Sequence, residues 1–478
     1  MNRLPPAAFC VLALLGGCSL APDFKLPAMD LPDWWSNAGA EPRPAAEMDT
    51  LVPPPPWWKA FGVPELDALE AAALANNHDL KAALARIAQA EAQFAIAGGP
   101  MLPTVGLSAS DQVLRRSSAS ATSTSSTSSS RTSKPGVASH SYQGSVSASY
   151  ELDFWGKNRA AIESAGATLR ASEFDRDVVA LTLTANVASA WFQVMALADR
   201  VETARRNLAI ARQTLELAEK QESFGKVSGL EAAQQRSNVA LIEAQVPVLE
   251  LQRQQARDGL AVLCGLPPAR LGPVQATLSA LSVPTLAAGL PSELLLRRPD
   301  IRKAEAGLRA ANADIGVARA QLFPSITLTA ERGYSSVHLS SLLEPHSAFW
   351  TLGAGLTATL FDHGKLMGNV RLSEAKKLEL TEIYQTVVLT ALRDVEDGLA
   401  AIRLLAEQEG AQALAVLSAR EAQRLADIRY REGAVDYLTV LEAQRTLLQA
   451  EDGAIQTRLA RFNAAIGLYK ALGGGTGP

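Results

Sequence analysis

The chain has 478 residues, of which 47% are hydrophobic, 5% aromatic and 20% charged, and its formal net charge is −4. A chain of this length can bury a large core, and few aromatic side chains beside abundant Ala and Leu are typical of extended helices packed through small residues. The slightly acidic balance and the lack of a Lys/Arg run exclude an electrostatic footprint for nucleic acid.

The first residues have the features of a secretory signal. Arg3 precedes an apolar run over residues 7–15, too short to span a bilayer, which leads through Gly16 and Gly17 to Cys18. We expect residues 1–17 to be removed and Cys18 to become the lipid-modified first residue, since this stretch resembles a bacterial lipobox. An ordinary signal peptide with an incidental Cys is the alternative. Cys264 is then the one remaining thiol, so we expect no internal disulfide.

Residues 18–56 are predicted to form a lipidated, extended segment. Proline recurs at a density that excludes helix and favours an extended chain lying on the outside of a body. The paired tryptophans Trp34–Trp35 and Trp57–Trp58 are expected to anchor this segment by packing.

A long pattern of helix, proline break, strand, polar loop, strand, Gly-Lys and helix then occurs twice. A repeat of this length indicates a duplicated half-domain rather than a solenoid. Repeat 1 covers 57–264, with strands at about 103–115 and 142–154, a long helix at about 156–224 and a return helix at about 228–264. Repeat 2 covers 291–472, with strands at about 324–334 and 350–361, a long helix at about 364–432 and a return helix at about 436–472. A Pro/Gly-rich connector, 265–290, joins the repeats, and a flexible tail, 473–478, follows them.

The first long helix carries an apolar seam at alternating steps of three and four residues, typical of coiled-coil packing. The seam comprises Ala180, Leu183, Val187, Ala190, Val194, Leu197, Val201, Ala204, Leu208, Ala211, Leu215 and Ala218. Such a helix spans roughly 100 Å at about 1.5 Å per residue. It therefore cannot fold back into a compact globule.

The strands alternate between an apolar or small face and a hydroxyl-rich face, and aromatic residues bound them. This is the pattern of an outer-membrane β-barrel, although a half-buried soluble sheet has the same period. Four strands leave open edges, which cannot exist in hydrocarbon, so several chains must complete one barrel. Two chains give a barrel filled by side chains, and three give a lumen wide enough for water.

These features resemble the TolC-like outer-membrane factors of tripartite efflux systems, in the lipoprotein branch of OprM and NodT type. The most specific segments are residues 290–302, 311–326, 362–365, 429–433, 441–445 and 468–475. The resemblance implies a mainly α-helical fold with a small membrane β part. It also implies a homotrimer with a 12-stranded β-barrel and an α-barrel tunnel, in the outer membrane with its helical body in the periplasm. The implied partners are membrane lipid, a periplasmic adaptor protein and an inner-membrane pump.

By the same resemblance, the helix turns form the periplasmic entrance. The adaptor is expected to contact Gly225, Lys226, Val227, Ser228, Gly433, Ala434 and Val435. The gate candidates are the acids Asp436 and Glu442 with Tyr430 and Arg429 as partners, and a ring of carboxylates there is expected to bind cations. Val435 and Thr439 stand where branches of the family place an Asp, which leaves the narrowest ring open. Asp436 is also a plain candidate for a helix N-cap.

No catalytic or nucleotide-binding motif occurs, and the loop histidines lack ligand spacing. We therefore expect no enzyme activity and no cofactor or metal besides the lipid on Cys18. The leading hypothesis is a passive efflux conduit. The alternatives are the outer-membrane component of a protein secretion system and a non-conducting periplasmic structural lipoprotein.

Overall fold

The computed structural model describes residues 20–32, 34–37, 56–115, 138–225, 227–272, 277–284 and 297–474. The chain divides into two compact units. The first comprises Met1–Leu26, Ala88–Arg170 and Ala306–Glu382, and the second comprises Pro27–Ile87, Ala171–Glu305 and Ile383–Pro478. The predicted signal peptide and Cys18 lie outside the described residues.

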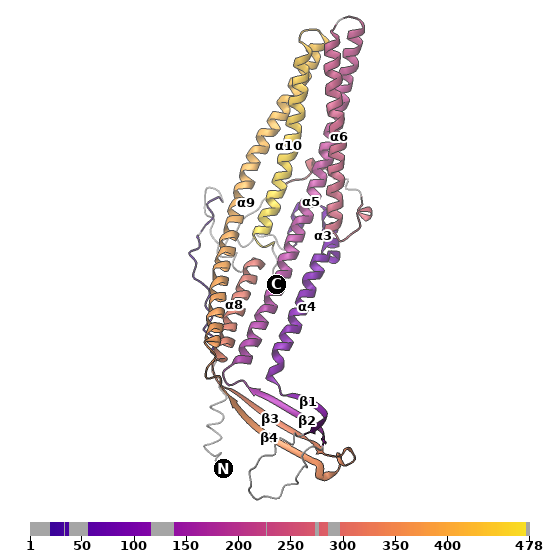
Figure 1. Cartoon of the computed structure of the whole chain (residues 1–478). Helices are drawn as coiled ribbons and strands as arrows, with labels where there is room; N and C mark the ends of the chain where they lie inside the picture. Colours follow the sequence, from indigo (N-terminus) through magenta and orange to yellow (C-terminus); the bar gives the residue numbers. More distant parts are fainter. Residues whose placement is uncertain are drawn as a thin grey trace. The chain divides into compact units, whose positions relative to one another are not determined.

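The first unit contains one antiparallel sheet with the strand order β1-β2-β3-β4 (Figure 1). The strands are β1 (Thr104–Arg115), β2 (Ala138–Leu152), β3 (Ser325–Ser336) and β4 (Ala348–Thr357). Neighbouring strands pair throughout in a continuous register, and β1 and β4 each keep one edge without a partner among the described strands. The sheet is thus open within a single chain.

Two strand boundaries differ from the predicted ones. β2 begins at Ala138 rather than near residue 142, because Arg115 at the end of β1 pairs with Ala138 and the ladder continues through the intervening serines. β4 ends at Thr357 rather than near residue 361, because its partner β3 begins at Ser325, opposite Thr357. The apolar alternation continues beyond that point, but the backbone there has no strand to pair with.

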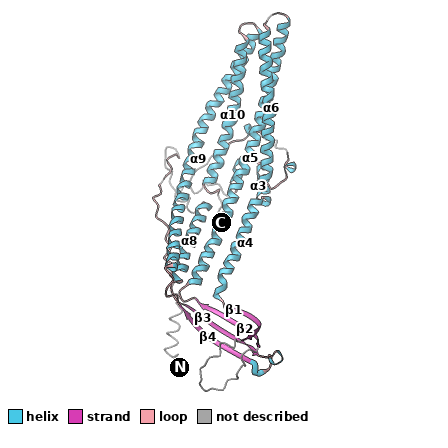
Figure 2. Cartoon of the chain, in the orientation of Figure 1, coloured by secondary structure: helices cyan, strands magenta, loops and turns pink. Residues whose placement is uncertain are grey.

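Long helices make up most of the remaining structure (Figure 2). The helices α5 (Lys157–Ser223) and α9 (Lys365–Arg431) each have 67 residues, and the return helices α6 (Gly229–Leu263) and α10 (Tyr437–Ala471) each have 35. These equal lengths are consistent with a duplicated half-domain. In the α5 seam, eight of the predicted positions are buried: Leu183, Val187, Val194, Leu197, Val201, Ala204, Ala211 and Ala218.

A second group of shorter helices packs around the long ones. It comprises η1 (Trp57–Phe61), α3 (Pro64–Asn76), α4 (His78–Gly98) and α8 (Pro299–Ala320). The chain breaks between α3 and α4 at Asn77, whose side-chain oxygen accepts hydrogen bonds from the backbone N–H groups of Asp79 (2.8 Å) and Leu80 (3.0 Å). Its amide nitrogen donates to the carbonyl of Leu263, so one side chain caps α4 and ties it to the end of α6.

The largest hydrophobic core lies in the second unit, where α3 packs against α5, α6 and α10. Trp57, Leu66, Trp191, Phe192 and Phe462 are at most 2% exposed in this core. Among the helices that the structure describes, α5 also contains a stretch apolar enough to cross a membrane. Since 56% of that stretch is buried, we interpret it as the core of this packing.

The extended N-terminal segment packs along the helices in both units. In the second unit Trp35 is 5% exposed and lies against Val395 and Leu468, while the Glu396 carboxylate accepts the backbone N–H of Ser36 at 2.7 Å. Trp35 and Trp57 are therefore anchors as predicted. Trp34 is 65% exposed, and the expectation that it packs down is wrong.

One residue of the family-like segment at 290–302 has a clear structural role. The guanidinium of Arg298 is largely buried, and it donates to Asp300 at 2.6 Å, to Asp394 of α9 at 3.4 Å and to the carbonyl of Ala471 at 3.0 Å. A buried, multiply bonded guanidinium is costly to replace, because its partners would lose their hydrogen bonds. Arg298 thereby fastens the start of α8 to the end of α10.

Candidate gate at the helix turns

Two short turns join the long helices to their return helices in the second unit. After α9, Gly433 adopts φ +72°. The N–H of Gly433 donates to the carbonyl of Tyr430 (3.0 Å), and the N–H of Ala434 donates to the carbonyl of Arg429 (2.8 Å). This pair of bonds is a Schellman motif, which needs a left-handed residue where glycine stands. After α5, Gly225 adopts φ +67° in the same way.

The predicted adaptor-contact residues lie on these turns. Gly225, Ser228, Gly433 and Ala434 are exposed, and Val227 and Val435 are half-buried, whereas Lys226 lies outside the described residues. Phe224 and Leu438 beside them are 76% and 62% exposed. The turns thus offer exposed apolar side chains to another molecule.

Asp436 is the N-cap of α10. Its Oδ1 accepts the backbone N–H of Thr439 at 3.0 Å and the Thr439 hydroxyl at 2.6 Å, and these bonds lower the pKa of the carboxyl. The capping role that the sequence allowed is therefore present in the structure. Glu442, nearly two turns further along α10, and Arg429, near the end of α9, are exposed.

Two buried tyrosines hold the turn of one hairpin against the other. Tyr430 is 4% exposed and its hydroxyl donates to the Glu231 carboxylate of α6 at 3.4 Å. Tyr437 is 1% exposed, and its hydroxyl donates to Gln235 of α6. Burial, followed by the charge of Glu231, raises the pKa of Tyr430 to about 12, and burial also raises the pKa of Tyr437. Both hydroxyls are therefore neutral donors at physiological pH.

The partners of these tyrosines, Glu231 and Gln235, were not among the residues that the sequence predicted. Glu231 and Gln235 lie one turn apart in α6, and Gln235, which is fully buried, also donates to the carbonyl of Ala211 in α5 at 2.6 Å. A polar residue in an otherwise apolar seam is the signal that could have drawn attention to Gln235. Its two bonds join α6 to both α5 and α10.

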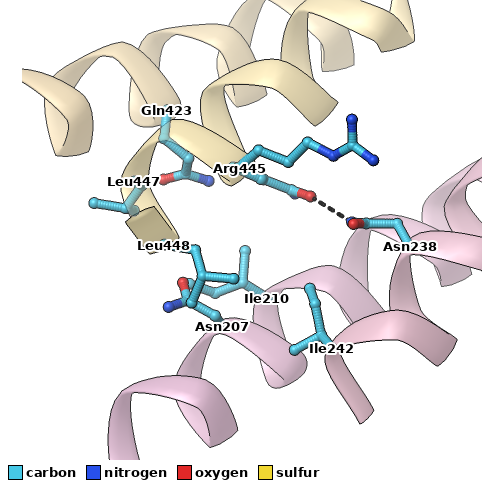
Figure 3. Close-up of a pocket in the computed structure, with 9 residues that line it drawn as sticks. Asn207, Ile210, Asn238, Ile242, Gln423, Arg445, Leu447 and Leu448 are labelled. Carbon is cyan, nitrogen blue, oxygen red and sulfur yellow. Dashed lines mark hydrogen bonds between the residues drawn. The ribbon is translucent and has the colours of Figure 1, made fainter. Parts of the chain in front are cut away.

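A second polar layer lies further along the same helices. The Asn238 amide donates to Gln444 of α10 at 3.3 Å, and Gln444 donates to the Thr214 hydroxyl of α5 at 3.2 Å. A cavity of about 20 Å³ adjoins this layer, and Asn207, Ile210, Asn238, Ile242, Gln423, Gln444, Arg445, Leu447 and Leu448 line it (Figure 3). Such a volume holds about one water molecule. Polar layers of this kind hold helices in register. They also separate at a lower cost in free energy than an apolar seam, because water can replace their hydrogen bonds.

Comparison with known proteins gives a consistent result. The family model described as outer membrane efflux protein matches residues 69–266 and 290–474. The chain is 43% identical to the pyoverdine export outer membrane protein OpmQ of Pseudomonas aeruginosa over 99% of this chain and 97% of that protein. It is 33% identical to the toluene efflux pump outer membrane protein TtgC of Pseudomonas putida over 97% and 93%. The structure is similar to the open state of the MtrE outer membrane channel of Neisseria gonorrhoeae, with a TM-score of 0.83, 30% identity and coverage of 96% and 98%.

Proposed function

Because this chain belongs to the outer membrane efflux protein family, whose members are transport proteins, and is an efflux channel component of the outer membrane, we propose that three copies enclose one passive conduit. Each copy contributes four strands to a 12-stranded barrel. The helices form a tunnel in the periplasm, and its entrance is gated at the helix turns.

The open sheet is the observation that carries this proposal. β1 and β4 each keep a free edge among the described strands, and an unpaired edge cannot lie in hydrocarbon. One face of the sheet presents large, exposed apolar side chains, among them Leu107 (83% exposed), Trp350 (73%), Leu352 (72%) and Leu356 (71%). A face of this kind suits lipid, and the opposite face of Ser, Thr and Gly suits water.

The gate is proposed to consist of the tyrosine contacts and the polar layer. The Tyr430–Glu231 and Tyr437–Gln235 bonds join the α9–α10 hairpin to the α5–α6 hairpin. Opening the entrance would require these bonds to break and water to replace them. Asp436 and Glu442 are exposed beside these contacts and would supply a threefold set of carboxylates for cations.

The proposed partners and cargo are inferred from the named relatives of this chain. The exposed turns, including Phe224 and Leu438, would contact a periplasmic adaptor, which links the conduit to an inner-membrane pump. The names of two relatives refer to pyoverdine and toluene, so we propose small organic molecules as cargo rather than secreted polypeptides. Lipid on Cys18 would hold the extended segment, in which Met29, Leu31 and Trp35 pack on the helices, at the membrane.

Planar-bilayer recording of the purified full-length protein tests this function. We expect discrete conductance steps from a trimer that withstands mild detergent, and more frequent openings when Tyr430→Phe and Tyr437→Phe are combined. A folded trimer that stays silent even with both substitutions would favour the structural lipoprotein. A stable folded monomer would contradict the shared barrel.

A further inference from the structure

Only two charged side chains lie on the polar face of the described sheet, and both are acidic. The register places Glu151 of β2 and Glu331 of β3 among Ser, Thr, Gly and Gln residues on this face. The other charged residues of the strands fall on the apolar face: Asp111, Arg115 and Arg332. The two faces therefore differ in charge as well as in polarity.

The two carboxylates have different surroundings. Glu151 lies near the end of β2, just before α5 begins. Its carboxylate accepts a hydrogen bond from the ammonium group of Lys157 at 2.6 Å, so its charge is compensated. Glu331 has no cationic partner among the described residues. Its Oε1 accepts a hydrogen bond from the Nε2 of Gln143 at 3.2 Å. A neutral amide orients a carboxylate but leaves its full negative charge in place.

The contact between Gln143 and Glu331 spans a place where β2 and β3 approach closely. Gln143 pairs with Ser335 and Glu331 pairs with Ser147, so their hydrogen bond crosses the Ser145–Gly333 pair that lies between them. A Cβ on Gly333 would lie 2.3 Å from the carbonyl oxygen of Gly144 and 2.6 Å from the Cβ of Ser145, so Gly333 permits the close approach of the two strands. The hydrogen bond from Gln143 fixes the height of the Glu331 carboxylate along β3.

We propose that Glu331 is a selectivity-determining residue of the β-barrel, which gives the lumen a preference for cations and for solutes with positive groups. This proposal rests on the proposed conduit. Three chains would set three equivalent carboxylates at one level of the lumen, and the other acidic residue on the polar face of the described strands, Glu151, is paired with Lys157. Rings of carboxylates at one level of a pore favour cations.

Ion selectivity of the reconstituted channel tests the proposal. The permeability ratio of K⁺ to Cl⁻ is measured from the reversal potential under a KCl gradient near 0.1 M, since the Debye length is about 10 Å there and about 3 Å at 1 M. We expect Glu331→Gln, which keeps the shape and the contact with Gln143, to lower the ratio about two-fold. Glu331→Lys should invert the preference, and Glu331→Asp should retain it.

Two controls separate this effect from others. Arg332→Gln removes a charge one residue away on the apolar face, and we expect an unchanged ratio. A shift with Arg332→Gln and none with Glu331→Gln would reverse the assignment of the faces and overturn the proposal. The Glu331 variants are also measured in a protein that carries Asp436→Asn and Glu442→Gln. This background removes the acidic residues at the entrance, so any remaining effect of Glu331 on selectivity does not arise there. An unchanged ratio in both backgrounds also overturns it, whereas a silent wild-type trimer contradicts the conduit itself.

Discussion

The hydroxyl of Tyr430 lies 3.4 Å from the carboxylate of Glu231, and this contact joins the end of α9 to the start of α6. Such a contact is worth on the order of 1 kcal/mol when one partner is partly exposed. We expect Tyr430→Phe and Glu231→Ala, which remove the donor and the acceptor respectively, each to raise the ratio of open to closed time about five-fold. The double variant should open no more often than either single variant, because all three lack the same bond.

Single-channel dwell times measure this coupling. Tyr469→Phe is the matched control, since Tyr469 is equally buried but stacks on Trp57 in the main core, away from the turns. Additive effects of the two substitutions would show that Tyr430 and Glu231 do not act through one contact.

Asp436 combines a structural role with a candidate electrostatic one, and substitutions can separate the two. Asp436→Asn keeps an oxygen acceptor for the Thr439 N–H, whereas Asp436→Ala removes it. We expect hydrogen exchange of the amides at 437–441 to quicken roughly several-fold in the Ala variant and to change little in the Asn variant. Divalent-ion block should weaken in Asp436→Asn combined with Glu442→Gln, and an undiminished block would contradict cation binding at the turns.

The pKa of Asp436 adds a pH dependence to the cap. Because the pKa of this carboxyl is lowered in the folded state, the stabilisation by the charged cap is present at neutral pH. It is lost as the pH falls through the lowered pKa. The protection of the amides at 437–441, taken relative to the intrinsic exchange rate at each pH, should therefore fall in acid in the wild type, and the Asn variant should lack this acid-dependent part.

Gly333 is expected to tolerate no side chain. The Cβ of an alanine would lie 2.3 Å from the Gly144 carbonyl oxygen, so β2 and β3 would have to separate. Strain of this kind costs about 1 to 3 kcal/mol. We expect Gly333→Ala to lower the yield of detergent-resistant trimer about thirty-fold at the midpoint of that cost. Gly355→Ala is the control, because its nearest neighbouring atom lies 4.0 Å away, and equal yields would refute the steric argument.

Local patterns in the sequence were sufficient for the helices and for the sheet. The seam of α5 is regular because each position meets the neighbouring helix at the same spacing, and the strands alternate because their two faces meet different surroundings. The fold class, a helical protein with four antiparallel strands, is confirmed on these grounds. The end of β4 was missed because it depends on where β3 begins, which no pattern within β4 records.

The gate contacts could be predicted only in part. Tyr430 was selected from its position before the turn, but Glu231 lies 199 residues away in the sequence. Such a pairing depends on how two hairpins pack, so a single sequence without a partner signal does not reveal it. The N-cap role of Asp436 was recognisable because capping is local.

Glu70 of α3 is expected to make the stability of the main core depend on pH. Its side chain is fully buried, and neither carboxyl oxygen has a hydrogen-bond partner in the described part of the chain. Burial, together with the nearby charge of Asp67, raises the pKa of Glu70 to about 9. In the unfolded chain this carboxyl loses its proton above its ordinary pKa of 4.5, whereas in the folded protein it keeps the proton up to a pKa of about 9. The stability of the folded state therefore falls as the pH rises from 4.5 to about 9.

Cys264 can report this effect, because it is buried in the same core. Burial, followed by the nearby charge of Glu70, raises the pKa of the Cys264 thiol to about 11. Alkylation of Cys264 requires local opening. We expect Glu70→Gln, which is neutral at every pH, to stabilise the core by roughly 1 to 3 kcal/mol at pH 8.5 and to slow alkylation at least about five-fold there. At pH 5.5, only about one unit above the ordinary value of 4.5, the difference should be much smaller. The exposed Glu91→Gln of α4 is the control, and a variant alkylated as fast as wild type at pH 8.5 would show that Glu70 does not carry this cost.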